Sequence, residues 1–252
     1  MTTVEIQYVG GPTSLITLGG IRLLTDPTFD APGEYTVGTR KLVKTTGPAL
    51  RPSDLPPVDA VLLSHDHHPD NLDTAGRAWV TSAPLVLSTP SAHGRLGAPV
   101  RALPTWEHTE VGDVRVTAVP ALHGPKGSEP LVGEVTGFLL SGPGLPKVYV
   151  SGDNADLDLV REIADREGPV DVAILFAGAA RTPLVPDATL TLTSEQAAQA
   201  ATVLGARHVV PLHFEHWGHF TQNGPTLTKA FAEAGLTDRL HLLEPGSSVR
   251  LS

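Results

Sequence analysis

Short runs of valine, isoleucine and leucine recur along the chain, and glycine, proline or aspartate interrupts nearly every one. Apolar runs bounded by such turn-forming residues are typical of β-strands rather than of helices. The pattern predicts strands at residues 4–9, 14–18, 21–25, 60–64, 85–88, 114–119, 135–141, 147–152, 172–176 and 208–212. The chain is therefore expected to be rich in β-sheet.

Helical spacing of apolar residues appears in three segments of the second half, 157–168, 194–205 and 226–235, and each ends at glycine. Asp156 and Ser194 are the expected N-caps of the first two. The early strands resemble hairpins and meanders, whereas the later strands alternate with helices. This mixed pattern predicts an α+β fold, a four-layer αββα sandwich in which helices flank two mixed β-sheets.

Residues 27–57 show no clear periodicity, and a segment of this kind in a compact domain is usually functional or disordered. We expect it to form a wall of the active site. The hydrophobic and charged fractions, 40% and 18%, are even along the 252 residues. Because no linker is visible, we expect a single domain over residues 1–252, made of two pseudo-symmetric halves at about 1–125 and 126–252.

The formal net charge of −9, with no basic run, argues against nucleic acid or an anionic membrane surface as partner. A small-molecule substrate and a multivalent cation are the expected partners, and homo-oligomer formation stays open. The chain has no cysteine, so a metal would be held by nitrogen and oxygen. No leader-like or membrane-spanning stretch is visible, and we expect a cytoplasmic protein.

The most informative segment is VLLSHDHHPDNLD, residues 61–73, in which an apolar strand leads into His65, Asp66, His67, His68 and Asp70. In extended backbone, residues i and i+2 lie on the same face, so His65 and His67 are expected to present two imidazoles to one ion. A strand end with solvated histidines is the alternative. It is less favoured because a buried strand rarely ends in so many polar side chains without a ligand.

Three further apolar runs end at a potential ligand: His123, Asp153 and His213 follow predicted strands. Glu215, His216 and His219 come soon after the last of these. Alone, His123 or His213 would more often be an ordinary core or surface histidine. Four such strand ends in one chain favour a shared metal site.

This ordered series resembles the metallo-β-lactamase superfamily, whose pattern is a strand followed by His-x-His-x-Asp-His, then a later histidine, a bridging aspartate and a final histidine. The opening VEIQYVGGPTSLITLGGIRLLTDPTF is similar to the L-ascorbate-6-phosphate-lactonase-like branch. The resemblance implies the αββα sandwich of the metallo-β-lactamase type and a metal-dependent hydrolase. It assigns the first metal to His65, His67 and His123, the second to His213 and Asp70, and the bridge to Asp153.

The chain departs from this pattern after His67, where His68 and Pro69 precede Asp70 and Asn71. A one-residue insertion aligns Asp70 with the family's aspartate and leaves Asn71 where a histidine would stand. An amide oxygen is a weaker and harder ligand than an imidazole. We therefore expect one or two divalent ions per chain, Zn²⁺ first and Mn²⁺ as the alternative, with His68 or His216 available to a second site.

A bound divalent ion lowers the pKa of its water from 15.7 to about 7, which supplies a nucleophile without an activated serine. Asp70 and His219 are the expected catalytic residues: Asp70, or else Asp153, orients the water, and His219 stabilises an oxyanion or protonates the leaving group. Trp217 is expected to face the pocket beside His219. Asp26 either orients a ligating histidine or makes a turn with the proline that follows it.

The resemblance implies hydrolysis of a lactone, ester, amide or phosphodiester. Arg40, Lys41 and Lys44 could bind a phosphate, although a solvated charged loop is the more frequent role of such residues. Two other functions stay open. One is an iron-dependent oxidoreductase on the same fold, and the other is a degenerate metal-binding protein without catalysis, which only Asn71 supports.

Overall fold

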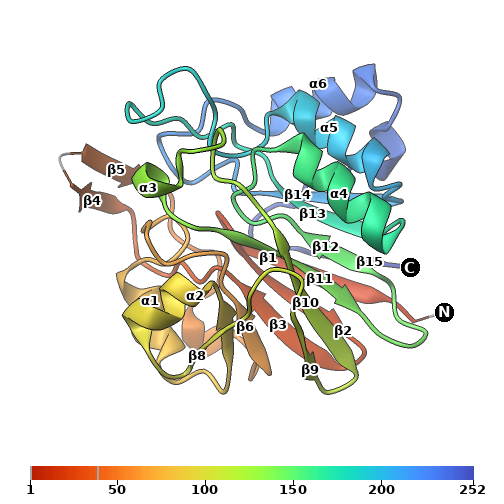
Figure 1. Ribbon diagram of the computed structural model, residues 1–252, viewed down its shortest axis with the longest axis horizontal. Coiled ribbons are helices and arrows are strands. Elements are labelled where there is room, and N and C mark those ends of the chain that lie inside the picture. Colours follow the sequence, from red (N-terminus) through yellow and green to blue (C-terminus); the bar gives the residue numbers. More distant parts are fainter. Residues whose placement is uncertain (1, 39) are drawn as a thin grey trace.

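The computed structural model describes residues 2–38 and 40–252 and contains two large β-sheets with helices on their outer faces (Figure 1). The strands are β1 (Val4–Gly10), β2 (Thr13–Leu18), β3 (Ile21–Thr25), β4 (Gly33–Val37), β5 (Arg40–Lys44), β6 (Ala60–Leu62), β7 (Val86–Ser88), β8 (Val100–Ala102), β9 (His108–Val111), β10 (Val114–Pro120), β11 (Thr136–Ser141), β12 (Val148–Val150), β13 (Val172–Phe176), β14 (His208–Leu212) and β15 (Ser248–Leu251). The helices are α1 (Thr74–Val80), α2 (Pro90–Leu96), α3 (Glu129–Val132), α4 (Leu157–Glu167), α5 (Ser194–Val203) and α6 (Gly224–Glu233), with short 3₁₀ turns η1 (Pro52–Asp54) and η2 (Thr237–Arg239).

The first sheet has the strand order β15-β1-β2-β3-β6-β7-β8, and the second has the order β14-β13-β12-β11-β10-β9. Both sheets mix parallel and antiparallel pairs. The C-terminal strand β15 lies in the first sheet, while β9 and β10, which precede residue 125, lie in the second. The expected division into halves near residue 125 stays a prediction.

The inner faces of the two sheets share one apolar core, in which residues such as Ile6 and Ile16 pack with Phe138 and Ile174. Fully burying one such side chain stabilises the fold by roughly 1.5–3 kcal/mol. On the outer face of the second sheet, α4, α5 and α6 cover a separate apolar cluster, and the region of α1 and α2 packs on the outer face of the first. The four layers confirm the expected αββα sandwich.

The predicted strands and the three predicted helices are all present, but one expected N-cap is wrong. Asp156 does cap α4, since its side chain accepts hydrogen bonds from the backbone of Asp158 and Leu159. The cap of α5 is Thr193 and not Ser194, because Thr193 and Gln196 form a reciprocal capping box. Ser194 lies one residue inside the helix, where its hydroxyl group hydrogen-bonds Thr226 at 2.8 Å.

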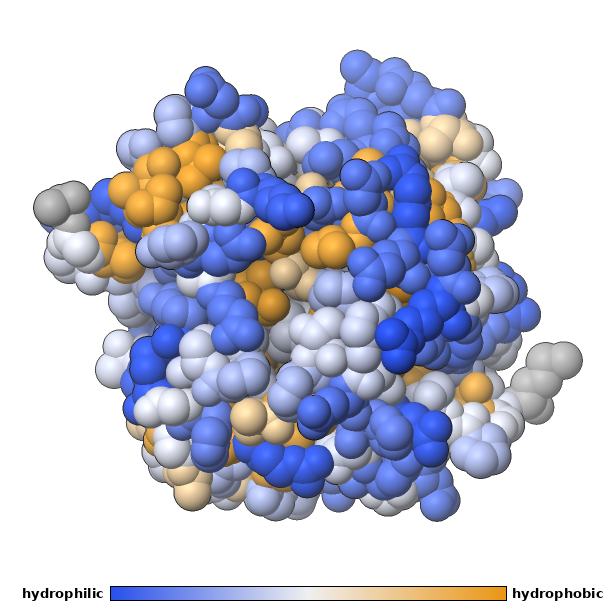
Figure 2. Space-filling view, viewed as in Figure 1, coloured by the Kyte–Doolittle hydropathy of each residue, from blue (hydrophilic) through white to orange (hydrophobic). Residues whose placement is uncertain are grey.

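The segment 27–57, which showed no periodicity, contains the separate β4–β5 hairpin and η1. Figure 1 places this hairpin near α3, apart from both large sheets. Orange, apolar surface gathers around the same place in Figure 2, whereas much of the remaining visible face is polar. No helix among the described residues is both long and apolar enough to cross a membrane.

The strand directions bring distant loops to one edge of the second sheet. Strands β12, β13 and β14 are parallel. Strand β10 is antiparallel to β11, which is antiparallel to β12, so β10 runs in the same direction as β12. The segments that follow β10, β12 and β14 therefore emerge together, and they carry His123, Asp153 and His213.

Candidate metal centre

Two adjacent groups of potential metal ligands lie where these loops meet the loop after β6. The first group is His65, His68 and His123, and the second is Asp70, Asp153 and His213. Within each group, one potential ligating atom from each residue lies within 4.8 Å of the others. The centre therefore joins ligands from both sheets.

In the first group, the Nε2 atom of His65 lies 3.1 Å from the Nδ1 atom of His68. The Nδ1 atom of His123 lies 2.8 Å from the carbonyl oxygen of Leu190, which fixes this nitrogen as the donor. The other ring nitrogen of His123 is buried and has no hydrogen-bond partner among the described residues. Its lone pair is therefore available to a metal, as expected of a ligand whose tautomer is set from behind.

In the second group, the Nε2 atom of His213 lies 3.4 Å from a carboxylate oxygen of Asp70 and 3.5 Å from one of Asp153. Both ring nitrogens of His213 and the Oδ1 atom of Asp70 are buried without a hydrogen-bond partner in the described chain. Buried polar atoms are rarely left unpaired, because desolvation without a partner is unfavourable. A cation between these side chains would satisfy them.

Asp153 lies between the two groups. Its Oδ1 atom faces His213, while its Oδ2 atom lies 3.7 Å from the Nδ1 atom of His123. The side chain is almost completely buried, so its orientation is restricted. A carboxylate in contact with one histidine of each group lies between the two candidate metal positions, and its contact with His123 is to the nitrogen that donates to Leu190, not to the unpaired Nε2 atom.

The electrostatics of the centre favour a cation. Burial lowers the pKa of His65 well below its ordinary value and lowers that of His68 to about 4, so both imidazoles are neutral, as metal ligation requires. Burial alone would raise the pKa values of Asp70 and Asp153, but neighbouring histidines outweigh it and hold both low. Conversely, these two carboxylates overcome the effect of burial on His213 and raise its pKa to about 10. The second group thus requires a positive charge, whether it comes from a proton or a metal.

The third histidine of the first group, beside His65 and His123, is His68. The sequence pattern had assigned His67 to this group. The strand ends at Leu62, and the chain then turns, with the backbone of Asn71 and Leu72 donating to the carbonyl oxygen of His68. Extended geometry, which would align residues i and i+2, therefore does not continue through the motif. The assignment of His67 as a ligand stays a prediction.

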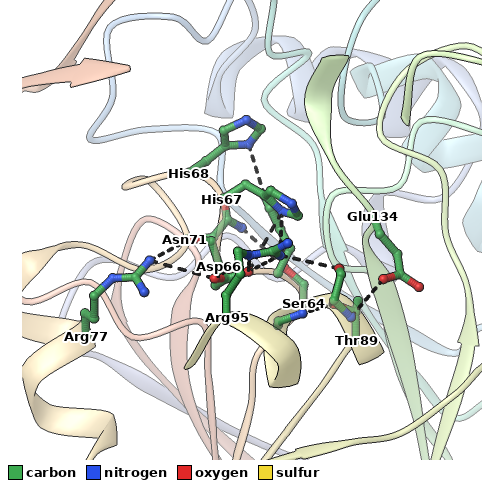
Figure 3. Close-up of polar contacts among 12 residues, drawn as sticks. Ser64, Asp66, His67, His68, Asn71, Arg77, Thr89, Arg95 and Glu134 are labelled. Carbon is green, nitrogen blue, oxygen red and sulfur yellow. Dashed lines mark hydrogen bonds and ion pairs between the residues drawn. The ribbon is translucent and has the colours of Figure 1, made fainter. Parts of the chain in front are cut away.

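His67 is partly exposed and lies in a separate polar network shown in Figure 3. Its Nδ1 atom is 3.4 Å from the guanidinium group of Arg95, which also pairs with the carboxylate of Asp66. Arg77 donates to the backbone oxygen of Asp66 at 2.8 Å. Arg77 of α1 and Arg95 of α2 therefore bind the loop after β6 on the side away from the candidate metal ligands. Sequence reasoning missed this role, because nothing in the local pattern pairs Asp66 with either helix.

Asn71 hydrogen-bonds the candidate ligand Asp153 through its amide nitrogen, whereas its Oδ1 atom is buried without a hydrogen-bond partner among the described residues. Its amide nitrogen lies 3.2 Å from Asp153 and 3.5 Å from Asp26. Asp26 accepts a hydrogen bond of 2.6 Å from the backbone of Ser64, whose hydroxyl group lies 2.9 Å from Nδ1 of His65. Asp26 and the candidate ligand His65 therefore both contact Ser64. Burial raises the pKa of Asp26 to about 8.

Gly152 allows the loop after β12 to pass close to its neighbours. Its φ angle is +55°, and an added Cβ atom would lie 2.5 Å from the backbone oxygen of Thr136. Only glycine combines this conformation with such a close backbone approach. Gly152 therefore fixes the position of Asp153.

His219 lies in the centre and Trp217 does not. The Nε2 atom of His219 is 3.0 Å from Oδ2 of Asp70. Trp217 is 3% exposed and packs against Tyr35 at a centroid distance of 5.3 Å, on the inner side of the hairpin. The Nζ atom of Lys44 lies 5.6 Å from the centroid of the tryptophan ring. His219 therefore lies beside the candidate ligand Asp70 and lines the pocket described below, while Trp217 packs against the hairpin.

A small pocket, with room for about one water molecule, lies beside both groups of candidate ligands. Its lining comprises Arg40, Leu42, His68, Asp70, His123, Ala180, Arg181, Thr182, Leu190 and His219. Arg40 and Leu42 belong to the segment 27–57, which was expected to form a wall of this site. His216 is absent from this lining and stacks on Tyr8 instead.

The sandwich and its buried His/Asp centre define a metal-binding protein of the metallo-β-lactamase fold. Residues 21–214 match the family model described as beta-lactamase superfamily domain, and the chain belongs to this family. Relatives include a UPF0173 metal-dependent hydrolase of Rubrobacter xylanophilus, 29% identical over 97% of this chain and 96% of that protein. A UPF0173 metal-dependent hydrolase of Thermococcus onnurineus is 25% identical over 98% of this chain and 100% of that protein.

Solved structures share the fold at low sequence identity. An isothiocyanate hydrolase from Delia radicum gut bacteria has a TM-score of 0.84 at 18% identity, covering 98% of this chain and 99% of that one. A possible metal-dependent hydrolase from Veillonella parvula has a TM-score of 0.83 at 16% identity, with 99% of each chain covered. CmlA, a diiron beta-hydroxylase from Streptomyces venezuelae, has a TM-score of 0.70 at 18% identity over 99% of this chain and 54% of that one. Family, fold and relatives identify a metal-dependent hydrolase; the lactonase-like branch stays a prediction.

Proposed function

We propose that the chain hydrolyses a lactone, ester or phosphodiester bond of a small molecule with a metal-activated water. The observation that carries this proposal is Asp153, whose two carboxylate oxygens face the two groups of ligands. When bound, a divalent metal polarises the scissile carbonyl or phosphoryl group and lowers the pKa of water. The remaining chemistry belongs to the protein side chains.

The residues divide into ligands and proton carriers. We assign His65, His68 and His123 to one metal position and Asp70 and His213 to the other, with Asp153 between them. Asp70 also contacts His219 at 3.0 Å, which places an acceptor beside a potential donor at the floor of the pocket. In this assignment Asp70 orients the attacking water, and His219 delivers a proton to the leaving group.

The choice of metal separates hydrolysis from the alternative function. Nitrogen and oxygen ligands suit zinc and manganese, which support hydrolysis, but they also suit iron. The fold likeness to a diiron beta-hydroxylase keeps an iron-dependent oxidoreductase as the second candidate. Complete ligand groups speak against a degenerate protein without a metal.

Elemental analysis of the protein purified without added metal, followed by turnover assays, tests the proposal. We expect zinc or manganese, together with release of product from at least one of a neutral ester, a lactone and a phosphodiester. The His123→Ala variant should lose both metal and turnover, whereas His241→Ala, which alters a histidine paired with His208 elsewhere, should keep both. Iron with no hydrolysis of any substrate would reject the proposal in favour of redox chemistry.

A further inference from the structure

Two arginines at the metal pocket lack acidic partners. Arg40 and Arg181 both line it, and within the described chain neither guanidinium group has a carboxylate oxygen within 4.0 Å. The neighbouring lysines of the same hairpin differ, because Lys41 pairs with Glu34 and Lys44 pairs with Asp73. Both lysines of the hairpin therefore have a carboxylate partner, whereas Arg40 has none among the described residues and can bind an anionic ligand.

Both arginines form hydrogen bonds with the loop after β13. Arg40, on β5, donates a hydrogen bond to the hydroxyl group of Thr182, which lies in the loop after β13. The backbone nitrogen of Arg181 donates to the carbonyl oxygen of His219 at 3.3 Å, and a guanidinium nitrogen of Arg181 lies 3.5 Å from the carbonyl oxygen of Pro186 in its own loop. The pocket is therefore bordered by two arginines from segments that are far apart in sequence.

This positive charge contrasts with the rest of the molecule. A formal net charge of −9 repels an anionic ligand at long range. Guanidinium groups bind carboxylates and phosphates through short, charge-assisted hydrogen bonds, and two of them together offset this repulsion locally. A neutral substrate would gain little from the arrangement.

The remaining wall of the pocket is apolar. Leu42, Ala180 and Leu190 line it. Leu131 and Leu184 are 55% and 42% exposed, and Val43, on the face of β5 opposite to Arg40 and Leu42, is 40% exposed; these are three of the four large exposed hydrophobic residues among those described.

These exposed side chains come from β5, α3 and the 181–190 loop. The buried Val132 of α3 clusters with Ala180 and Leu190, so α3 and this loop are in contact. The apolar surface in Figure 2 gathers over α3 and the hairpin. The apolar wall therefore continues onto the surface beyond the pocket.

From these features we infer that the substrate is an anionic amphiphile. Its carboxylate or phosphate group binds Arg40 and Arg181, and its apolar chain lies along Leu42, Leu190 and Leu184. The inference rests on the proposed function, because it places the bond to be cleaved beside the ligands at the floor of the same pocket.

Isothermal calorimetry of octanoate and octyl phosphate binding to the metal-loaded protein tests whether the arginines bind an anionic group, with 1-octanol as the neutral probe. Arg40→Gln and Arg181→Gln should each weaken binding of the anions by ten- to a hundredfold, the range for a charged hydrogen bond. Arg40→Lys should recover part of the affinity. Arg101→Gln, which removes the same charge from an exposed position on β8, should change nothing. The octyl phosphate and octanoate arms show which anion is preferred.

The length of the ligand's alkyl chain tests whether the apolar residues bind it. Affinity should rise from acetate through hexanoate to octanoate, and Leu184→Ser should reduce that increase. The inference is overturned if wild-type protein binds neither anion, if the two glutamine variants bind them as tightly as wild type, or if affinity does not depend on chain length. Failure of the proposed function is distinct. Arginine-dependent binding without hydrolysis of any ester or phosphodiester would reject hydrolysis alone, and hydrolysis without arginine dependence would reject only the anionic substrate.

Discussion

At the residue scale, the candidate metal centre consists of side chains that follow apolar strands. The structure brings together His65, His123, Asp153 and His213 from four such strand ends, and this pattern alone predicted them as ligands. The i and i+2 spacing favoured His67 over His68, because the hydrophobic pattern does not show that extended backbone ends at Leu62. The turn after His68 is closed by backbone hydrogen bonds from Asn71 and Leu72 to His68. Such bonds do not depend on the spacing of hydrophobic residues, so this spacing does not predict them.

Paired alanine variants separate the two histidines. His68→Ala should weaken metal binding by more than the 10- to 100-fold typical of losing a residue that only supports a ligand, because it removes a ligating nitrogen. His67→Ala should retain wild-type metal affinity, since this side chain contacts Arg95 outside the centre. Metal titration with a competing chelator measures both. The reverse order would restore the assignment that the family pattern implied.

The two aspartates should also respond differently. Asp153→Ala removes the carboxylate between both groups, so metal and activity should be lost together. Asp70→Ala should keep the metal held by the three histidines but lose turnover, because the acceptor beside His219 is gone. Metal stoichiometry and single-turnover rates distinguish these outcomes. A fully active Asp70→Ala protein would show that the alignment through the one-residue insertion is wrong.

At the element scale, the β4–β5 hairpin shows what the sequence pattern could not supply. Its strands are largely exposed or half-buried, so their sequence lacks the regular alternation of apolar and polar residues that predicts a strand. What fastens the hairpin is a buried ion pair, in which Nζ of Lys44 lies 2.8 Å from Asp73. Asp73 also caps α1 through Gly76 and accepts from the backbone of Asp30. One carboxylate therefore joins the hairpin, the preceding loop and a helix.

Replacing Lys44 with alanine should destabilise the protein by about 3–5 kcal/mol, because it leaves a buried carboxylate without its counter-charge. Lys41→Ala is the matched control on the same strand: its pair with Glu34 is exposed to solvent, so its loss should leave the unfolding midpoint close to that of wild type. Urea unfolding followed by tryptophan fluorescence measures both changes. Equal midpoints for the two variants would mean that the buried pair does not fasten the hairpin.

At the scale of the whole molecule, the order of strands and helices was sufficient to predict the αββα layers, because apolar runs that alternate with amphipathic helices require sheets covered on their outer faces. Which strands pair could not be predicted. Strand β15 joins β1 through backbone hydrogen bonds between the two ends of the chain, and a local pattern contains no information on so distant a partner. The short helices α1 and α2 span too few turns to show a periodicity.

Because the ligands come from both sheets, metal binding should stabilise the whole sandwich. A metal present at 100 times its dissociation constant contributes about 2.7 kcal/mol, which corresponds to roughly 5–10 °C in Tm for a protein of this size. Chelation should lower the melting temperature by this amount, and added zinc or manganese should restore it. Asp153→Ala should melt at the same temperature with and without chelator, whereas His241→Ala should retain the full response. If chelation strips the metal from the wild-type protein and leaves its melting temperature unchanged, the two sheets are not joined through the metal.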